Sequence, residues 1–271
     1  MHRLPPLRST RSLLLCGLLP ALLPLQAARA DEPSPPASTP AAAAPASPPS
    51  SWSLGLGVIY QQQAYRDADD KVLALPLVSY ENRWVRFNVP SVDLKLLPAG
   101  PVDLALRLRY DTSGYEADDS PALAGMEDRK SGLWAGAALR WRGGLGELGL
   151  EASGDASGNS KGAQAKLSLA KDFRLGRLGL TPRLAVTWMD AKYVDFYYGV
   201  RAAEALVTRA AYTGRATANT ELGLRAGYGL TPTQIMFVDL SVTQLGQAIQ
   251  DSSIVDTSTV GGARLGYLYR F

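Results

Sequence analysis

Cysteine and histidine are almost absent from this sequence. Its 271 residues contain one of each, Cys16 and His2, and both stand within the first thirty residues. This segment has a basic start, an apolar run over residues 13–25 and the small-residue pattern Ala28-Arg29-Ala30, which together are typical of a secretory signal peptide. We therefore expect residues 1–30 to be removed before Asp31, which leaves a mature chain without a thiol or an imidazole.

That absence excludes several kinds of chemistry. The mature chain forms no disulfide, has no thiol nucleophile or imidazole base, and offers no thiolate or imidazole ligand to a metal. The remaining catalytic alternative is a pair of carboxylates chosen from Glu147, Glu151, Glu221 and Asp239. Basic residues are expected on the same face, so a salt-bridged surface is the simpler interpretation. We expect no enzyme, no cofactor and no metal site.

A strong excess of positive charge is missing as well. The chain has 28 Lys and Arg residues against 25 Asp and Glu residues, but four of the basic residues and none of the acidic ones lie in the signal peptide. The mature chain lacks the clustered positive charge that nucleic-acid binding requires. No run after residue 50 is long and apolar enough for a transmembrane helix.

Residues 31–50 are rich in Pro, Ala and Ser and carry no periodic apolar pattern. This composition is typical of a disordered tether, which we expect in the periplasm. The rest of the chain, residues 51–271, is long enough for one domain.

Alternation with a period of two dominates that domain. Residues 102–110 place leucines on one face of a strand and Asp103, Arg107 and Arg109 on the other, whereas a helix would mix the two sets. The pattern recurs and predicts about twelve strands. They lie near residues 52–60, 72–80, 84–89, 92–96, 102–110, 133–141, 147–151, 163–169, 178–188, 221–228, 236–242 and 263–271.

The connections favour an all-β, transmembrane antiparallel up-and-down barrel of about 12 strands, with 10–14 possible. Short turns alternate with longer polar loops, as in bacterial barrels with short periplasmic turns and long outer loops. The connection near residues 88–91 is the exception, because it would be a very short outer loop. A soluble β-sandwich also alternates, but aromatic residues at strand ends and charge on the second face of nearly every strand favour a membrane barrel.

The second face predicts a lumen of mixed charge. Its candidate residues are Arg107, Arg109, Arg140, Glu147, Glu151, Arg183, Glu221, Arg225, Asp239 and Arg264. Such a lining is compatible with a narrow polar channel and with an ion-paired plug, and the plug is slightly favoured. The acidic loop 111–131 is interpreted as a solvated loop, or alternatively as a weak site for calcium or lipid headgroups.

Particular stretches resemble the MipA/OmpV family of MltA-interacting proteins. Tyr197, Tyr198, Gly199 and Val200 resemble the Tyr-Tyr-Gly-Val signature of that family. Residues 75–82, 123–129, 251–256 and 266–271 also fit its pattern, and the blocks follow in family order. Ser253 departs from the proline expected there.

The resemblance implies an outer-membrane barrel without catalytic residues, in contact with outer-membrane lipid. It also implies that Tyr267, Tyr269 and Phe271 form the aromatic C-terminal signal for the barrel-assembly machinery. Its implied role is a scaffold that brings a murein lytic transglycosylase and a murein synthase together. A small-solute channel and a surface adhesin are the two alternative hypotheses.

Overall fold

The computed structural model describes residues 50–97 and 100–271. The signal peptide and, apart from Ser50, the tether lie outside the described residues, so both stay predictions. No helix in the described part of the chain is long and apolar enough to cross a membrane.

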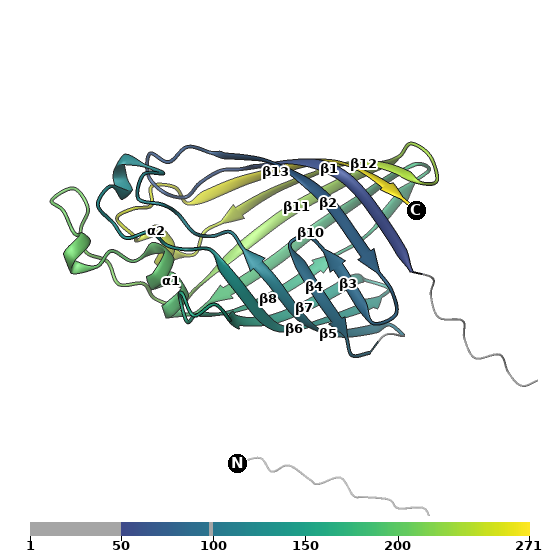
Figure 1. Ribbon diagram of the computed structural model, residues 1–271, viewed down its shortest axis with the longest axis horizontal. Helices are drawn as coiled ribbons and strands as arrows, with labels where there is room; N and C mark the ends of the chain where they lie inside the picture. Colours follow the sequence, from purple (N-terminus) through teal and green to yellow (C-terminus); the bar gives the residue numbers. More distant parts are fainter. Residues whose placement is uncertain (1–49, 98–99) are drawn as a thin grey trace, which may run out of the picture. The chain divides into compact units, whose positions relative to one another are not determined.

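The domain is a closed antiparallel β-barrel (Figure 1). Each strand pairs with the next one in the sequence, except that β8 and β9 both pair with β10. β13 pairs with β1, and the pairing of β10 with β11 completes the ring. The strands are β1 (Ser51–Gln61), β2 (Lys71–Glu81), β3 (Val85–Asn88), β4 (Ser91–Lys95), β5 (Val102–Asp111), β6 (Gly132–Gly143), β7 (Gly146–Asp155), β8 (Ala163–Ala170), β9 (Phe173–Leu175), β10 (Leu178–Met189), β11 (Thr217–Gly229), β12 (Gln234–Gln244) and β13 (Thr259–Arg270). The predicted antiparallel barrel of about twelve strands is confirmed, because β8 and β9 form one interrupted strand beside β10.

The interruption between β8 and β9 has a local cause. Lys171 and Asp172 lie between the two segments, opposite Thr181 and Pro182 of β10. The carbonyl of Pro182 accepts a long hydrogen bond of 3.3 Å from the Lys171 N–H, but proline has no N–H to return. The pairing with β10 resumes directly after these two residues, in the short strand β9.

The connection at residues 88–91 is not an outer loop. Val89 and Pro90 join β3 to β4 in a hairpin whose strands have four and five residues, against eleven in β2. Figure 1 shows these two arrows ending well short of the long strand beside them. The hairpin thus turns within the height of the barrel wall.

One face of the strands is apolar and exposed. Leu56 is 73% exposed and Leu222 is 57% exposed, although both are strand residues with apolar neighbours. In a membrane barrel the outer face of the strands contacts lipid hydrocarbon, so exposed apolar side chains on this face are favourable. Exposed aromatic side chains occur near both ends of the strands: Trp52, Trp141, Tyr228 and Tyr269 near one end, and Tyr60, Tyr110 and Trp188 near the other.

The two ends of the barrel differ. The helices α1 (Ala191–Tyr198) and α2 (Gln247–Gln250) lie at one end, here called the loop end (Figure 1). The short 3-10 helices η1 (Pro121–Leu123) and η2 (Ala202–Glu204) belong to the same loops. The opposite turn end carries the short turns and the last residue, where the Phe271 N–H donates to the Trp52 carbonyl.

Candidate functional site

The buried apolar core lies in the loops of the loop end. Leu123, Val194, Ile249 and Ile254 are fully buried, yet they come from three different loops. The other core residues are Ala64, Tyr65, Tyr115, Met126, Trp134, Met189, Tyr193, Tyr197, Val200, Leu245, Ala248 and Val255. We call this cluster the loop cap. Because these apolar side chains pack against one another, they are removed from water and form a layer at the loop end of the barrel.

Aromatic rings form the middle of the loop cap. The ring of Tyr193 lies 4.8 Å from that of Tyr197 and 5.6 Å from that of Trp134, in tilted and edge-on arrangements that aromatic pairs prefer. Tyr65 packs edge-on against Tyr115 at 4.8 Å and donates a hydrogen bond to the Tyr197 carbonyl. These contacts connect the β1–β2 loop, the β5–β6 loop and α1.

The four residues of the resemblance signature belong to this layer. Tyr197 and Tyr198 end α1, and the Tyr198 carbonyl accepts a hydrogen bond of 2.6 Å from Ser252. A Cβ atom on Gly199 would lie 2.2 Å from the Asp195 carbonyl oxygen, so the chain leaves the helix only with glycine there. Val200 then bridges to Tyr212. The four signature residues therefore fix the end of α1 and attach it to the loop cap.

A buried ion pair crosses the loop cap. Arg129 donates to both oxygens of Glu204 at 2.9 Å, and the two side chains are 2% and 6% exposed. Burial alone would raise the pKa of Glu204, but N–H groups of Arg201 and Glu127 and the Arg129 guanidinium bond to the carboxylate and hold its pKa below the usual value. Arg209 lies beside the pair and donates to the carbonyls of residues 122, 124 and 204.

The cap tyrosines are neutral at physiological pH. Burial raises the pKa of Tyr65 and of Tyr193 well above the usual value, and it raises the pKa of Tyr115 and of Tyr198 to about 12. A phenolate would be needed for a tyrosine base, so these residues act by packing and hydrogen bonding.

A first ionic cluster lines the inner face of β3 to β6. Asp93, with a side chain that is 3% exposed, accepts from Arg107 at 2.7 and 2.9 Å and also from Arg86 and Arg140. Asp103 accepts from Arg86 at 2.6 Å. These charged hydrogen bonds hold the side chains of neighbouring strands in place. The sequence placed Arg107, Arg140 and Asp103 on the charged face. Arg86 and Asp93 were not among the candidate lumen residues, although the leucines that alternate with Asp93 put it on the same face.

A second cluster lies on the inner face of β8 and β10 to β12. Arg183 donates to Glu221 at 2.8 Å and to Asp239 at 3.2 Å, while Lys166 lies 3.6 Å from Glu221. The guanidinium of Arg225 lies over the ring of Phe237, 4.1 Å from its centre. Arg264 stands opposite Asp239 in the ladder between β12 and β13.

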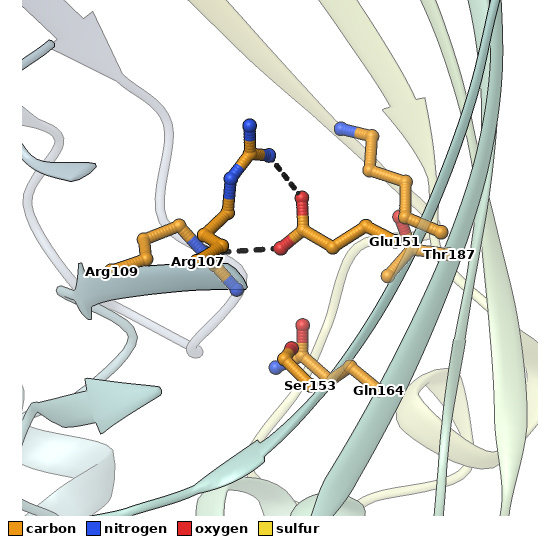
Figure 2. Close-up of a pocket in the computed structure, with 7 residues that line it drawn as sticks. Arg107, Arg109, Glu151, Ser153, Gln164 and Thr187 are labelled. Atoms are coloured by element: carbon orange, nitrogen blue, oxygen red, sulfur yellow. Dashed lines mark hydrogen bonds and ion pairs between the residues drawn. The ribbon is translucent and has the colours of Figure 1, made fainter. Parts of the chain in front are cut away.

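A cavity of about 290 Å³ lies between the two clusters. Figure 2 shows Glu151 extending across it toward Arg107 and Arg109. Glu151 accepts from Arg107 at 2.5 Å and lies 3.7 Å from Arg109 Nε. With Lys166 the lining has three cations and one anion, completed by Ser153, Gln164 and Thr187. The cavity is suited to a small anionic group.

The remaining predicted residues lie near the turn end. Glu147 pairs with Arg142 at 2.9 Å, and the two side chains are 37% and 53% exposed. Tyr267 and Tyr269 are each 37% exposed, and the ring of Tyr269 lies 5.0 Å from that of Phe271. Three or more His, Cys, Asp or Glu side chains do not gather into a metal site anywhere in residues 50–97 and 100–271.

Comparison with known proteins gives the family. A family model described as MltA-interacting protein MipA matches residues 54–271. The chain is 26% identical over 225 residues to the putative outer membrane protein YiaT of Escherichia coli K12, covering 82% of this chain and 92% of that protein. It is 26% identical over 223 residues to the MltA-interacting protein of the same organism, covering 81% and 90%. It is 24% identical over 224 residues to the outer membrane protein OmpV of Vibrio cholerae, covering 80% and 86%.

Among solved structures, the NanC porin aligns with 80% of this chain and 98% of its own, with a TM-score of 0.43 and 7% identity. The relatives bear the names of outer-membrane proteins, as expected for a barrel with an apolar outer face. This chain is an outer-membrane β-barrel that belongs to the MipA family.

Proposed function

We propose that this protein is an outer-membrane scaffold that holds a murein lytic transglycosylase at the periplasmic surface, together with a murein synthase. The loop end faces outward and the turn end faces the periplasm, as in other bacterial barrels. The name of the MltA-interacting relative, to which the chain is similar over most of its length, supports this partner class.

The loop cap is the observation that carries the proposal. A barrel that serves chiefly as a pore keeps its lumen accessible from the outside, whereas here buried residues of several loops pack across the loop end. Paired charges fill much of the inner face below it. A barrel built in this way is better suited to hold a partner than to pass large solutes.

The turn end offers an apolar surface for that partner. Leu145 lies in the turn between β6 and β7 and is 74% exposed, and Leu175 ends β9 and is 63% exposed. Arg142 and Lys171 line a cavity of about 400 Å³ beside the β6–β7 turn. Exposed leucines ringed by charge are typical of a protein docking surface.

The test is capture of a purified murein lytic transglycosylase by the detergent-solubilised barrel. We expect the native chain to retain the enzyme and the variant Leu145→Asp/Leu175→Asp to lose about 90% of the bound enzyme, since two central apolar contacts are replaced by charge. Val207→Asp is the matched control, because Val207 is a fully exposed apolar residue at the loop end. Failure of the native chain to enrich the enzyme over a bare resin would overturn the proposal.

A small-anion channel is the second candidate function. The cationic cavity between the two ionic clusters favours it, because three basic side chains face one carboxylate there. Planar-bilayer recording in symmetric chloride decides between the two functions. An anion-selective current from the native chain supports the channel, and the absence of current excludes it.

A further inference from the structure

The edge of β2 is open over half its length. The last hydrogen bond from the β3–β4 hairpin to β2 runs from the Val89 N–H to the Val78 carbonyl, and the ladder between β2 and β3 covers only residues 79–81 of β2. β2 continues from there to Lys71, paired with β1 along its other edge. Because peptide groups alternate in direction along a strand, those of residues 72, 74 and 76 point into the opening.

Residue 76 of this edge is a proline. Pro76 has no N–H to donate, and it stands at a position where the N–H would point away from β1. Within the described ranges, no hydrogen bond joins the backbone of residues 72–77 to anything on the open side. The sequence is therefore suited to an edge that stays unpaired.

This edge lies at membrane depth. Val72 is paired with Tyr60, an exposed aromatic residue near the loop end, and Pro76 is paired with Leu56, an exposed apolar residue at mid-strand. Open sheet edges are not stable against lipid hydrocarbon, and they persist only beside protein or a polar cavity. We call this unpaired stretch of β2, residues 72–77 above the β3–β4 hairpin, the notch; its backbone needs a protein or polar partner at this depth.

The lumen wall beside the notch is apolar. The inward residues of β2 include Leu73, Leu75 and Leu77, and Leu77 lies against the backbone of Gly57 and Gly266, where a Cβ atom would be 3.0 and 2.8 Å from its methyl group. Phe237 covers the other side of Gly266. The glycines make room for an apolar strip on the inner face of β2 and its neighbours β1 and β13.

A cation stands on the far side of the notch. Arg109 of β5 pairs in register with Ser91 at the tip of the hairpin and faces inward. Its Nε is buried 3.7 Å from Glu151 Oε1, and its Nη1 donates to Asp111 at 3.1 Å, whereas no hydrogen bond joins its Nη2 to another described residue. It also lines the cavity that contains Arg107 and Lys166. The N–H groups of Nη2 can therefore donate to an anionic headgroup.

The route into this space is lateral. The loop cap lies at the loop end, and the Lys71–Asp119 ion pair of 3.1 Å joins the first residue of β2 to the β5–β6 loop above the notch. A ligand that reaches Arg109 from the membrane therefore enters between β2 and β5, beneath that ion pair.

We propose that the notch between β2 and β5 is a lateral binding site for an anionic, single-chain amphiphile. The acyl chain lies along Leu73, Leu75 and Leu77, and the carboxylate or phosphate headgroup binds Arg109 at the edge of the cationic cavity. This amphiphile fits the two sides of the notch, one apolar and one basic, and its headgroup brings polar atoms to the unpaired edge of β2.

The test uses the mature barrel folded into phosphatidylcholine vesicles. A bimane fluorophore is attached to Leu75→Cys, which is then the only thiol in a chain that starts after Cys16. Titration with dibrominated stearate is expected to quench it saturably, whereas the same label on the membrane-facing Val58→Cys is expected to be quenched in proportion to added probe. Arg109→Gln is expected to raise the half-saturating concentration about tenfold, the loss expected for one charged hydrogen bond.

The controls separate binding from misfolding and from simple partition. Arg109→Lys keeps the charge and should restore most of the affinity, and Arg174→Gln, in exposed β9, should change nothing. Dibrominated stearyl alcohol should bind more weakly, and its half-saturating concentration should be the same for the native chain and for Arg109→Gln. The heat-dependent gel migration of each variant shows that the barrel is folded. Unsaturable quenching equal at positions 58 and 75, or an unchanged affinity in folded Arg109→Gln, would overturn the proposal.

Discussion

Arg129 and Glu204 meet inside the loop cap, where neither side chain has access to bulk water. Replacing Arg129 by alanine leaves the Glu204 carboxylate buried without its main partner, which costs about 3–5 kcal/mol. We expect that loss as faster amide hydrogen exchange in residues 196–212. Arg201→Ala is the control, since the Arg201–Glu127 pair is more than half exposed and is worth at most about 1 kcal/mol. Equal effects of the two substitutions would contradict a special role for the buried pair.

The lowered pKa of Glu204 also predicts a direction for pH dependence. A carboxyl group whose pKa lies lower in the folded cap than its usual value of 4.5 stabilises the cap at neutral pH. That contribution stays complete above this value and is lost as the pH falls through the lowered pKa. We expect cap exchange to accelerate below about pH 4.5. Glu204→Gln should be less stable at pH 7 and should show a flatter profile; an unchanged profile would refute this assignment.

At the scale of single strands, much of the structure was predictable from alternation. Arg107 and Arg109 were expected on one face because leucines fill the other, and the register between β5 and β6 keeps that separation. The height of a strand was harder to predict. Residues 84–96 alternate like their neighbours, and only the hydrogen bonds reveal that they form a half-height hairpin. Periodicity reports which face a residue takes and carries no information on where the neighbouring strand ends.

The seam between β1 and β13 depends on a glycine. A Cβ atom on Gly55 would lie 1.8 Å from the Tyr267 carbonyl oxygen, so Gly55→Ala must push the two strands apart. We expect the folded fraction after refolding into vesicles to fall several-fold, measured by heat-dependent gel migration. Gly144→Ala is the control, because nothing lies within 4 Å of a Cβ there. A normal yield from Gly55→Ala would show that the seam tolerates the displacement.

At the scale of the whole molecule, we expect the loop cap to limit access to the lumen from the loop end. Replacing residues 191–215 by a short Gly-Ser turn removes α1, the signature tyrosines and the Glu204 carboxylate from the cap. We expect this variant to carry a larger single-barrel conductance than the native chain in planar bilayers. An equal conductance would show that the closure lies deeper, among the ion pairs of the inner face.

The loop cap itself could not be predicted as a unit. Its members were visible as tyrosines and aliphatic residues in polar loops, and Tyr197 and Tyr198 were noticed only through a resemblance. Their partners lie far away in the sequence, as Tyr65 and Tyr197 do, and loops have no repeat that reveals such contacts. The notch beside β2 was hidden for the same reason, although Pro76 is a local sign of an unpaired edge.

The pairing of β1 with β13 has a consequence for biosynthesis. Leu54 lies opposite Tyr269, so one edge of β1 stays unpaired until almost the whole domain has been translated and exported. A truncated product that lacks β13 retains two open edges, which hydrocarbon does not tolerate. Ribosomal stalling or a late frameshift should therefore yield no partially functional protein, only chains left in the periplasm for chaperones and proteases.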